Sequence, residues 1–365
     1  MNLIRDEIRR DGPITFARFM ELALHHPRHG YYASGPQRLG EGGDFVTASD
    51  LGPAFGRAVA RQVEELDRHL DHPGTFDLIE FGAGRGLLAR DLLAALQTSN
   101  ENLHRRLRYT AVDASSGMRE EIERVAPEVQ VEVEPSAAGS GCLLAMELFD
   151  ALPVHRVIRR DGFLEEIGVG WDGERFHDAR LDPDAAVSAW AERYGAAAEE
   201  GFEAEVGLGI EAQIERWDRA LERGFALVLD FGDTAERLYT AERKRGTLMA
   251  YHAHRAREEY LERVGDQDLT AHVNFTALTD AAEARGWRLL GRTTQDRFLI
   301  ANGILEDFEE MDERTYHDPR GIRARQGIKR LIHPTGMGRM FQIWVFGKGL
   351  EGEPELTGLA DPFAR

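Results

Sequence analysis

Four acidic residues stand where four predicted strands end, and together they suggest what chemistry this chain performs. They are Glu80, Asp113, Glu147 and Asp230, and each closes or follows an apolar run. In a doubly wound sheet, ligands bind in the crevice beyond the carboxyl ends of the strands. Clustered carboxylates repel one another unless a cation lies among them. The pattern therefore predicts a crevice that receives a positively charged ligand.

The first of these strand ends carries a glycine-rich turn, EFGAGRG at residues 80–86. Glycine reaches backbone dihedrals closed to other residues and has no Cβ to collide with a ligand. Dinucleotide-binding turns usually read Gly-x-Gly-x-x-Gly. Here both gaps are single residues, and Glu80 precedes the first glycine by two positions. Acidic-x-Gly-x-Gly-x-Gly is the pattern of methyltransferases that use S-adenosylmethionine.

The charge of this cofactor agrees with the acidic surroundings of the turn. S-adenosylmethionine carries an amino group and a sulfonium but no phosphate, so Glu80 would attract it and would repel a pyrophosphate. We therefore expect S-adenosylmethionine, with S-adenosylhomocysteine as product, and Gly82, Gly84 and Gly86 at its site. Asp113 is suited to accepting both ribose hydroxyls; the alternative is a helix cap before Ser115. A nucleotide oxidoreductase and a purely structural turn remain alternatives for the motif.

Glu147 and Asp150 form the sharpest pair of candidate catalytic residues. They lie three residues apart just beyond the apolar run at 143–146, where methyltransferases of this fold meet the methyl acceptor. Methyl transfer is an in-line displacement, so the protein mainly positions the reactants and shapes the electrostatics. Two carboxylates can hold a guanidinium by forked hydrogen bonds and receive its proton. The structural alternatives are a salt bridge for Glu147 and a helix cap for Asp150.

Asp44 is a third catalytic candidate. It lies in a glycine-flanked loop, GEGGDFVT at residues 40–47, that could close over the cofactor. An ordinary surface loop is the alternative. The 13 histidines show no convincing metal-ligand spacing, and we expect no metal.

The composition narrows the partners and the compartment. A formal net charge of −19 disfavours nucleic acid and would steer a cationic substrate towards the protein. Cys142 is the one cysteine, so no disulfide within the chain can form. No apolar run approaches the roughly 20 residues that span a bilayer. The first ten residues read as a charged amphipathic helix rather than a signal peptide. We therefore expect a cytoplasmic protein without membrane insertion.

The order of predicted elements indicates an α/β fold. Strands are expected at 76–81, 108–113, 129–133, 142–147, 225–232, 287–293 and 341–346, and helices at 87–97, 116–126, 275–285 and 320–331. This alternation predicts a doubly wound, parallel sheet. Residues 154–180 are expected to form antiparallel hairpins that turn at Asp161-Gly162 and Asp172-Gly173, and residues 184–223 to be helical.

Several stretches together resemble the MidA family of S-adenosylmethionine-dependent methyltransferases. They are found in family order from about residue 14 to residue 347. The main ones are GDFVT at 43–47, EFGAGRG at 80–86, ELFDALPVH at 147–155, DFG at 230–232 and DLTAHVNF at 268–275. Three positions depart from the family pattern: Met146 is commonly polar, Asp113 is usually Glu, and Ser49-Asp50 is often Pro-Glu.

The resemblance implies a Rossmann-like class I methyltransferase sheet with an N-terminal helical lid and an internal β-hairpin and helical insertion. It places Thr47 and Met146 with the cofactor residues, and Glu147 and Asp150 at the acceptor. Mitochondrial members of the family methylate an arginine of a complex I subunit. The expected partner is therefore a protein or peptide that presents arginine. A small-molecule methyltransferase and an assembly chaperone without turnover are the alternatives.

The same pattern divides the chain into five regions. Residues 1–75 form the lid region, 76–153 the cofactor-binding half, 154–223 the insertion, 224–350 the rest of the core and 351–365 a tail. The insertion is expected to shape the substrate site, and its hairpins could pair two subunits into a homodimer.

Overall fold

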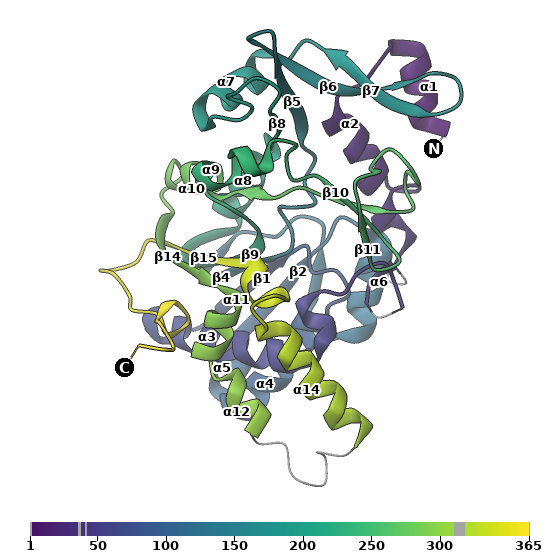
Figure 1. The fold of residues 1–365 in the computed structure, drawn as a ribbon. Coiled ribbons are helices and arrows are strands. Elements are labelled where there is room, and N and C mark those ends of the chain that lie inside the picture. The colour runs from purple at the N-terminus through teal and green to yellow at the C-terminus, as the bar shows by residue number, and fades with distance from the viewer. Residues whose placement is uncertain (1, 36–37, 41, 310–317, 365) are drawn as a thin grey trace.

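A mixed sheet of eight strands forms the centre of the molecule (Figure 1). The computed structural model describes residues 2–35, 38–40, 42–309 and 318–364. Along the sheet the strands run in the order β14-β15-β9-β4-β1-β2-β3, and β13 pairs with β9. Their bounds are β1 Phe76–Phe81, β2 Leu107–Val112, β3 Gln130–Glu132, β4 Ala138–Met146, β9 Leu221–Asp233, β13 Val273–Asn274, β14 Arg288–Thr294 and β15 Phe341–Lys348.

The strand directions follow the prediction except at one edge. The strands β1, β2, β3, β4 and β9 run parallel to one another. In contrast, β15 is antiparallel to both β9 and β14. The connections on either side of β15 decide the direction of this strand. Its apolar run would be the same in a parallel and in an antiparallel strand, so the sequence pattern does not report the direction. Every residue of β1 is buried, as expected for a strand covered on both faces.

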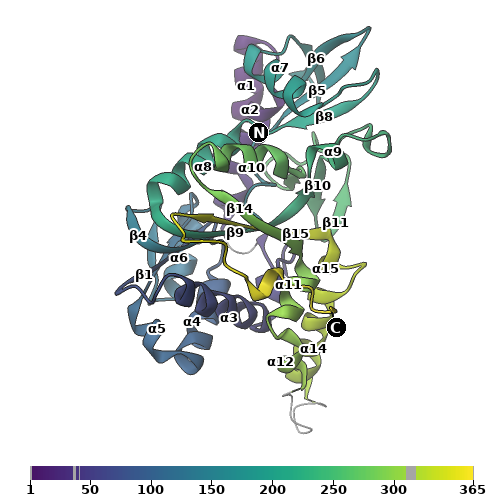
Figure 2. The ribbon, with the colours of Figure 1, turned by 90° about the vertical axis from the view of Figure 1, so that its left-hand side faces the viewer.

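Helices cover both faces of this sheet, as Figure 2 shows. One face carries α3 (Ala54–His69) and α4 (Leu87–Ser99), together with α6 (Ser116–Val125), α11 (Gln295–Ala301) and α14 (Pro319–Ile332). The other face carries α8 (Gly209–Ala220) and α10 (Phe275–Glu283). Shorter helices are α5 (Glu101–Arg106), α9 (Ala235–Leu238), α12 (Ile304–Glu309) and α15 (Met337–Met340).

The insertion forms a second, antiparallel sheet in the order β7-β6-β5-β8. It contains β5 (His155–Arg160), β6 (Phe163–Trp171), β7 (Phe176–Leu181), α7 (Ala185–Tyr194) and β8 (Glu203–Val206). The hairpins at 154–180 are confirmed, and Asp161, Gly162 and Gly173 have the positive φ that their turns need. The prediction of continuous helix over 184–223 is wrong at β8, because these residues pair with β5.

The N-terminal helices pack on the insertion rather than on the main sheet (Figure 1). The helices α1 (Asn2–Asp11) and α2 (Phe16–Met20) share an apolar cluster with Val169 of β6. A third sheet joins the same cluster, with the order β11-β10-β12. It consists of β10 (Met249–His252), β11 (Arg255–Arg257) and β12 (Asp268–Thr270), which the sequence pattern did not predict. The predicted division into five regions stays a prediction, although α3 lies in the core of the main sheet.

In residues 2–35, 38–40, 42–309 and 318–364, no helix is long and apolar enough to cross a membrane. The same residues contain no group of three or more His, Cys, Asp or Glu arranged to hold a metal ion.

Candidate active site

The glycine turn connects β1 to α4 and has the backbone that its sequence predicts. Gly82, Gly84 and Gly86 have φ values of +71°, +54° and +71°, in the left-handed region that favours glycine. A Cβ on Gly84 would have no atom nearer than Leu39 Cδ1 at 3.9 Å, so this residue leaves the approach to the turn open. A Cβ on Gly86 would lie 3.2–3.3 Å from atoms of Ile122. The third glycine therefore allows α6 to pack closely against the turn.

Two acidic strand ends flank this turn. Glu80 is buried and accepts a hydrogen bond from the Tyr109 hydroxyl at 2.7 Å. Its burial raises the pKa of Glu80 to about 8. Asp113 accepts hydrogen bonds from the backbone N–H groups of Gly84 at 3.0 Å and Ser115 at 2.9 Å. Asp113 thereby fixes the turn, and burial raises the pKa of its carboxyl as well.

The loop before α3 closes over the glycine turn. Thr47 and Asp50 form a capping box, with the Thr47 N–H donating to Asp50 at 2.9 Å. Asp50 also forms an ion pair with Arg85, the residue between the second and third glycines, at 2.9 Å. Because the Asp50 carboxylate is buried, this pair ties residues 42–51, which we call the lid loop, to the turn.

Between the lid loop and the turn lies a narrow cavity that we call the turn cavity. Five of the residues predicted to bind the cofactor line it, namely Thr47, Glu80, Gly82, Gly84 and Met146. The other two predicted residues lie close to these. Gly86 ends the glycine turn, and Asp113 accepts a hydrogen bond from Gly84 in the turn.

The groups around the turn cavity suit S-adenosylmethionine. The open side of Gly84 would admit an adenosyl group, and the buried Glu80 carboxylate lacks a cationic partner among the described residues. A cation there would offset the cost of burying this charge. Phe55, Leu87 and Leu88 add apolar surface. Thus the residues present fit a cationic nucleoside without phosphate.

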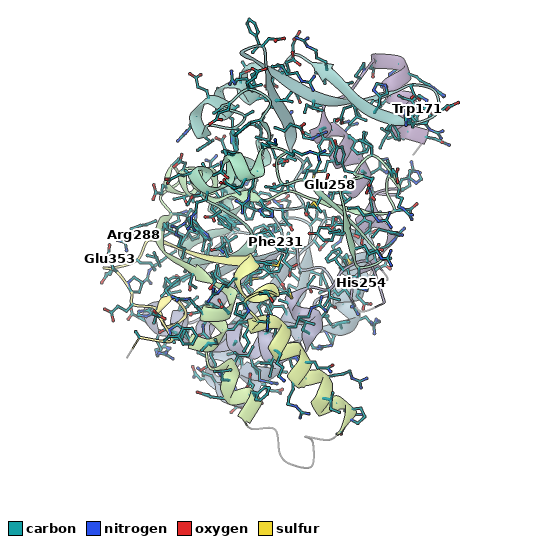
Figure 3. The ribbon with its side chains drawn as sticks, viewed as in Figure 1. Trp171, Phe231, His254, Glu258, Arg288 and Glu353 are labelled. Carbon is teal, nitrogen blue, oxygen red and sulfur yellow. The ribbon has the colours of Figure 1, made fainter. Side chains whose placement is uncertain are left out.

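A second and wider cavity of about 300 Å³ adjoins the first, and we call it the acidic cavity. Four carboxylates line it: Asp44, Glu147, Asp150 and Asp268. Its remaining wall is largely aromatic and sulfur-containing, with Tyr32, Phe45, Phe231, Tyr251, Phe341, Met337 and Met340. Figure 3 marks Phe231, at the end of β9, and His254, in the turn after β10; these two wall residues come from different sheets.

Glu147 lines both cavities and so lies where they meet. Its φ is +55°, an uncommon value for a residue with a side chain and one often found at functional sites. The Glu147 N–H donates to Leu229 O at 2.7 Å, and its carboxylate accepts from Ala48 N–H in the lid loop at 3.2 Å. Burial, and then the neighbouring Asp150, raise the pKa of Glu147 to about 8.

Two buried carboxylates, Asp150 and Asp268, also line the acidic cavity. Burial raises the pKa of Asp150 above its ordinary range. Asp268 accepts a hydrogen bond from the Tyr32 hydroxyl at 2.9 Å, and burial and Asp150 raise the pKa of Asp268 to about 8. Each of these carboxylates would become easier to ionise with a cation in the cavity.

Asp230 and Asp44 already accept hydrogen bonds from other groups of the protein. Asp230 accepts from the N–H groups of Leu148 at 3.1 Å and Phe149 at 2.7 Å, and so holds the loop that presents Glu147. Asp44 accepts from the Tyr31 hydroxyl at 3.0 Å and from Ala253 N–H at 2.8 Å. Its oxygens join the lid loop to the turn after β10, and a catalytic role for Asp44 stays a prediction.

Sequence reasoning missed Asp268, Tyr32, Tyr251 and Arg330 as wall residues of the acidic cavity. Asp268 lies in the stretch DLTAHVNF, which contributed to the family resemblance without a role for its acid. The available signal was an acidic residue, Asp268, directly before an apolar residue, Leu269, in the three-residue strand β12. Arg330 gave no signal, because it reads as one of several basic residues on an amphipathic helix.

Comparison with known proteins agrees with this geometry. Residues 58–293 match the family model described as "Putative S-adenosyl-L-methionine-dependent methyltransferase". A protein from Burkholderia thailandensis, whose crystal structure holds S-adenosyl-homocysteine, is 33% identical with a TM-score of 0.88. The match covers 98% of this chain and 94% of that protein.

More distant relatives carry a more specific name. The mitochondrial protein arginine methyltransferase NDUFAF7 of Homo sapiens is 27% identical over 93% of this chain and 81% of its own length. The homologue of this protein in Drosophila melanogaster is 26% identical over 95% of this chain and 84% of its own length.

Proposed function

The chain belongs to the MidA family of S-adenosylmethionine-dependent methyltransferases, and we propose that it transfers the methyl group to an arginine side chain of a partner protein. The observation that carries this proposal is the position of Glu147, shared by the turn cavity and the acidic cavity. A cationic acceptor in the acidic cavity would lie against Glu147 on one side, and the cofactor residues lie on the other.

The acidic cavity has the chemistry that a guanidinium group needs. The buried Asp150 and Asp268 and the half-buried Glu147 offer oxygen acceptors for its N–H groups. Tyr32, Phe231 and Tyr251 offer ring faces on which a planar cation can stack. The names of the distant relatives point in the same direction, since they are called protein arginine methyltransferases.

The cofactor, when bound, supplies an electrophilic methyl group on its sulfonium. The task of the chain is to hold the acceptor nitrogen in line and to take up its proton. In our proposal Glu147 binds the guanidinium, draws its positive charge away from the attacking nitrogen and receives the proton at a carboxylate oxygen. Asp150 and Asp268 keep the rest of the guanidinium in place. Asp230 acts through the loop 147–150 and is a positioning residue.

The test is the substitution Glu147→Gln. We expect the affinity for S-adenosylhomocysteine, measured by calorimetric titration, to stay near the wild-type value. Methyl transfer to arginine in cell proteins, measured by mass spectrometry with labelled cofactor, should fall by roughly 10²- to 10⁴-fold. A wild-type rate in this variant would disprove the role of Glu147.

A matched control separates chemistry from folding. Glu166→Gln changes another buried carboxylate, which lies outside both cavities and bonds to His155 at 2.7 Å. This variant should keep full activity. Cells without the gene should also lack arginine methylation on the partner protein; unchanged arginine methylation there would point to another acceptor.

A further inference from the structure

The basic helix α14 lies at the mouth of the acidic cavity. Residues 319–348, which begin with this helix, contain no Asp or Glu, although the chain has 64 of them. The same residues carry Arg or Lys at seven positions. A basic surface on a protein with a net charge of −19 stands out from the rest of the chain.

The exposed arginines of α14 are arranged as a line along the helix. Arg320, Arg323 and Arg330 are exposed, and their spacing of three and seven residues places them on one side. Gln326, also exposed, lies between them. We call Arg320, Arg323, Gln326 and Arg330 the basic stripe.

The basic stripe begins at the cavity and leads away from it. Arg330 is part of the wall of the acidic cavity. Figure 1 shows α14 running from the main sheet to the edge of the molecule, with its N-terminal end outermost. At about 1.5 Å per residue, Arg323 lies about 10 Å and Arg320 about 15 Å from Arg330 along the helix axis.

The helix is packed in this position, and the arginines of the basic stripe are exposed. A Cβ on Gly327 would lie 2.0 Å from Leu51 O, so the buried side of α14 is packed directly on the lid loop. Among the described residues, no carboxylate forms an ion pair with the guanidinium groups of the stripe. In contrast, the nearby Arg339 pairs with Asp296 at 3.6 Å.

We propose that the basic stripe binds an acidic segment of the methyl-accepting protein, beside the arginine that enters the acidic cavity. The inference rests on the proposed function, because it takes an arginine as the group in the cavity. An extended peptide advances about 3.3 Å per residue, so acids about three to five positions from the target arginine would reach Arg323 and Arg320. The acceptor is thus recognised by two charges of opposite sign at a fixed spacing.

Synthetic peptides test this proposal. Each has one central arginine, with Glu, Gln or Lys at positions three to five on one side or the other. Binding to the full chain is measured by fluorescence anisotropy with S-adenosylhomocysteine present. We expect one Glu peptide to bind roughly tenfold more tightly than its Gln counterpart, with a preference that weakens as salt is added. Equal binding of the Glu and Gln peptides would overturn the proposal.

Charge reversal locates the effect on the helix. R320E/R323E should abolish the preference for Glu and leave the affinity for S-adenosylhomocysteine unchanged. The control R105E/R175E makes the same change in net charge at exposed residues of α5 and the turn before β7 and should keep the preference. A preference that survives R320E/R323E would show that the acids bind elsewhere.

Two further outcomes distinguish this proposal from alternative explanations. If replacing the central arginine by alanine does not weaken binding, the arginine assignment fails, while a remaining Glu preference would still support the stripe. If wild-type protein sediments as a dimer and R320E/R323E as a monomer, the stripe binds a second copy of the chain and the proposal is wrong.

Discussion

At the scale of single residues, the acidic cavity places carboxylates where they are costly to ionise. Asp268 is buried and Glu147 is half-buried, and removal from water is the main reason that the pKa of each rises to about 8. Neighbouring carboxylates add to the effect. Such a site is less stable on its own than with a cation in it, which is the usual relation between a binding site and its ligand.

The substitution Asp268→Asn should reveal this cost through the pH dependence of stability. The folded chain holds a proton on Asp268 up to about pH 8, whereas the unfolded chain loses it near its ordinary value of 3.8. Wild-type protein therefore loses stability as pH rises between these values. The asparagine variant cannot ionise, so its melting temperature should exceed that of wild type at about pH 9 by several degrees.

The measurement is thermal unfolding of both proteins across this pH range. The advantage of the variant should shrink as pH falls and become small near the unfolded pKa. At the same time the variant should lose affinity for arginine peptides, because one acceptor of the guanidinium is gone. A variant that is less stable than wild type at every pH would contradict the expected cost of Asp268.

At the scale of elements, the lid loop, the glycine turn and α14 form one packed unit. Arg85 of the turn pairs with Asp50 of the lid loop, and the loop carbonyl of Leu51 lies against Gly327 of α14. Ala48 of the loop also donates to Glu147. Movement of the lid loop would therefore alter both cavities together.

Removing the ion pair between the lid loop and the turn should weaken cofactor binding. In Arg85→Met the side chain keeps much of its length but loses its charge, and the buried Asp50 loses its partner. We expect the dissociation constant for S-adenosylhomocysteine to increase roughly tenfold, as measured by calorimetric titration. Thermal unfolding of the same sample checks that the chain remains folded.

The helix that follows the turn, α4, offers a control for this variant. Arg90 of α4 pairs with its neighbour Asp91 at 2.8 Å, away from the lid loop. Arg90→Met should therefore leave the affinity near wild type. Equal loss of affinity in both variants would show that the Arg85 pair stabilises α4 in general rather than the lid.

In two elements the structure differs from what the local sequence pattern predicts. Residues 203–206 stand within a stretch predicted to be helical, yet they form β8 and pair with β5. Their pairing partner lies about fifty residues earlier in the chain, and no local pattern contains that information. The third sheet was missed because its three strands are only three or four residues long.

At the scale of the whole molecule, the distribution of charge suits the cationic acceptor that we propose. The net charge is −19, the acidic cavity contains four carboxylates, and the main basic helix lies at its edge. A negative protein raises the local concentration of a cationic partner and speeds its association.

This distribution predicts that salt strongly changes the KM for the acceptor and only weakly changes the affinity for the cofactor product. The KM for an arginine peptide should rise several-fold as ionic strength increases from about 0.01 M to 0.15 M, because the Debye length shortens from about 30 to 8 Å. S-adenosylhomocysteine has no net charge at neutral pH, so its dissociation constant should change little. Initial rates and titrations at matched salt check both, and a salt-independent KM would argue against a charged acceptor.

The sequence by itself determined the parts of this protein that depend on local chemistry. The glycine turn could be predicted because three positive φ values in five residues require glycine, and the acid two positions earlier indicated the charge of the cofactor. Most strands and helices of the main sheet followed from their apolar periodicity. The cofactor class and the family followed from these motifs, and the family match confirms both.

Only the tertiary structure decided which groups meet. Asp268, Tyr32 and Arg330 lie far from Glu147 in the sequence, and the packing of the third sheet, the N-terminal segment and α14 brings them to one cavity. The positive φ of Glu147 and its place between the two cavities also depend on contacts with β9 and the lid loop. Periodicity reports how a segment is buried, whereas a site depends on distances between segments, and those are fixed only when the chain has folded.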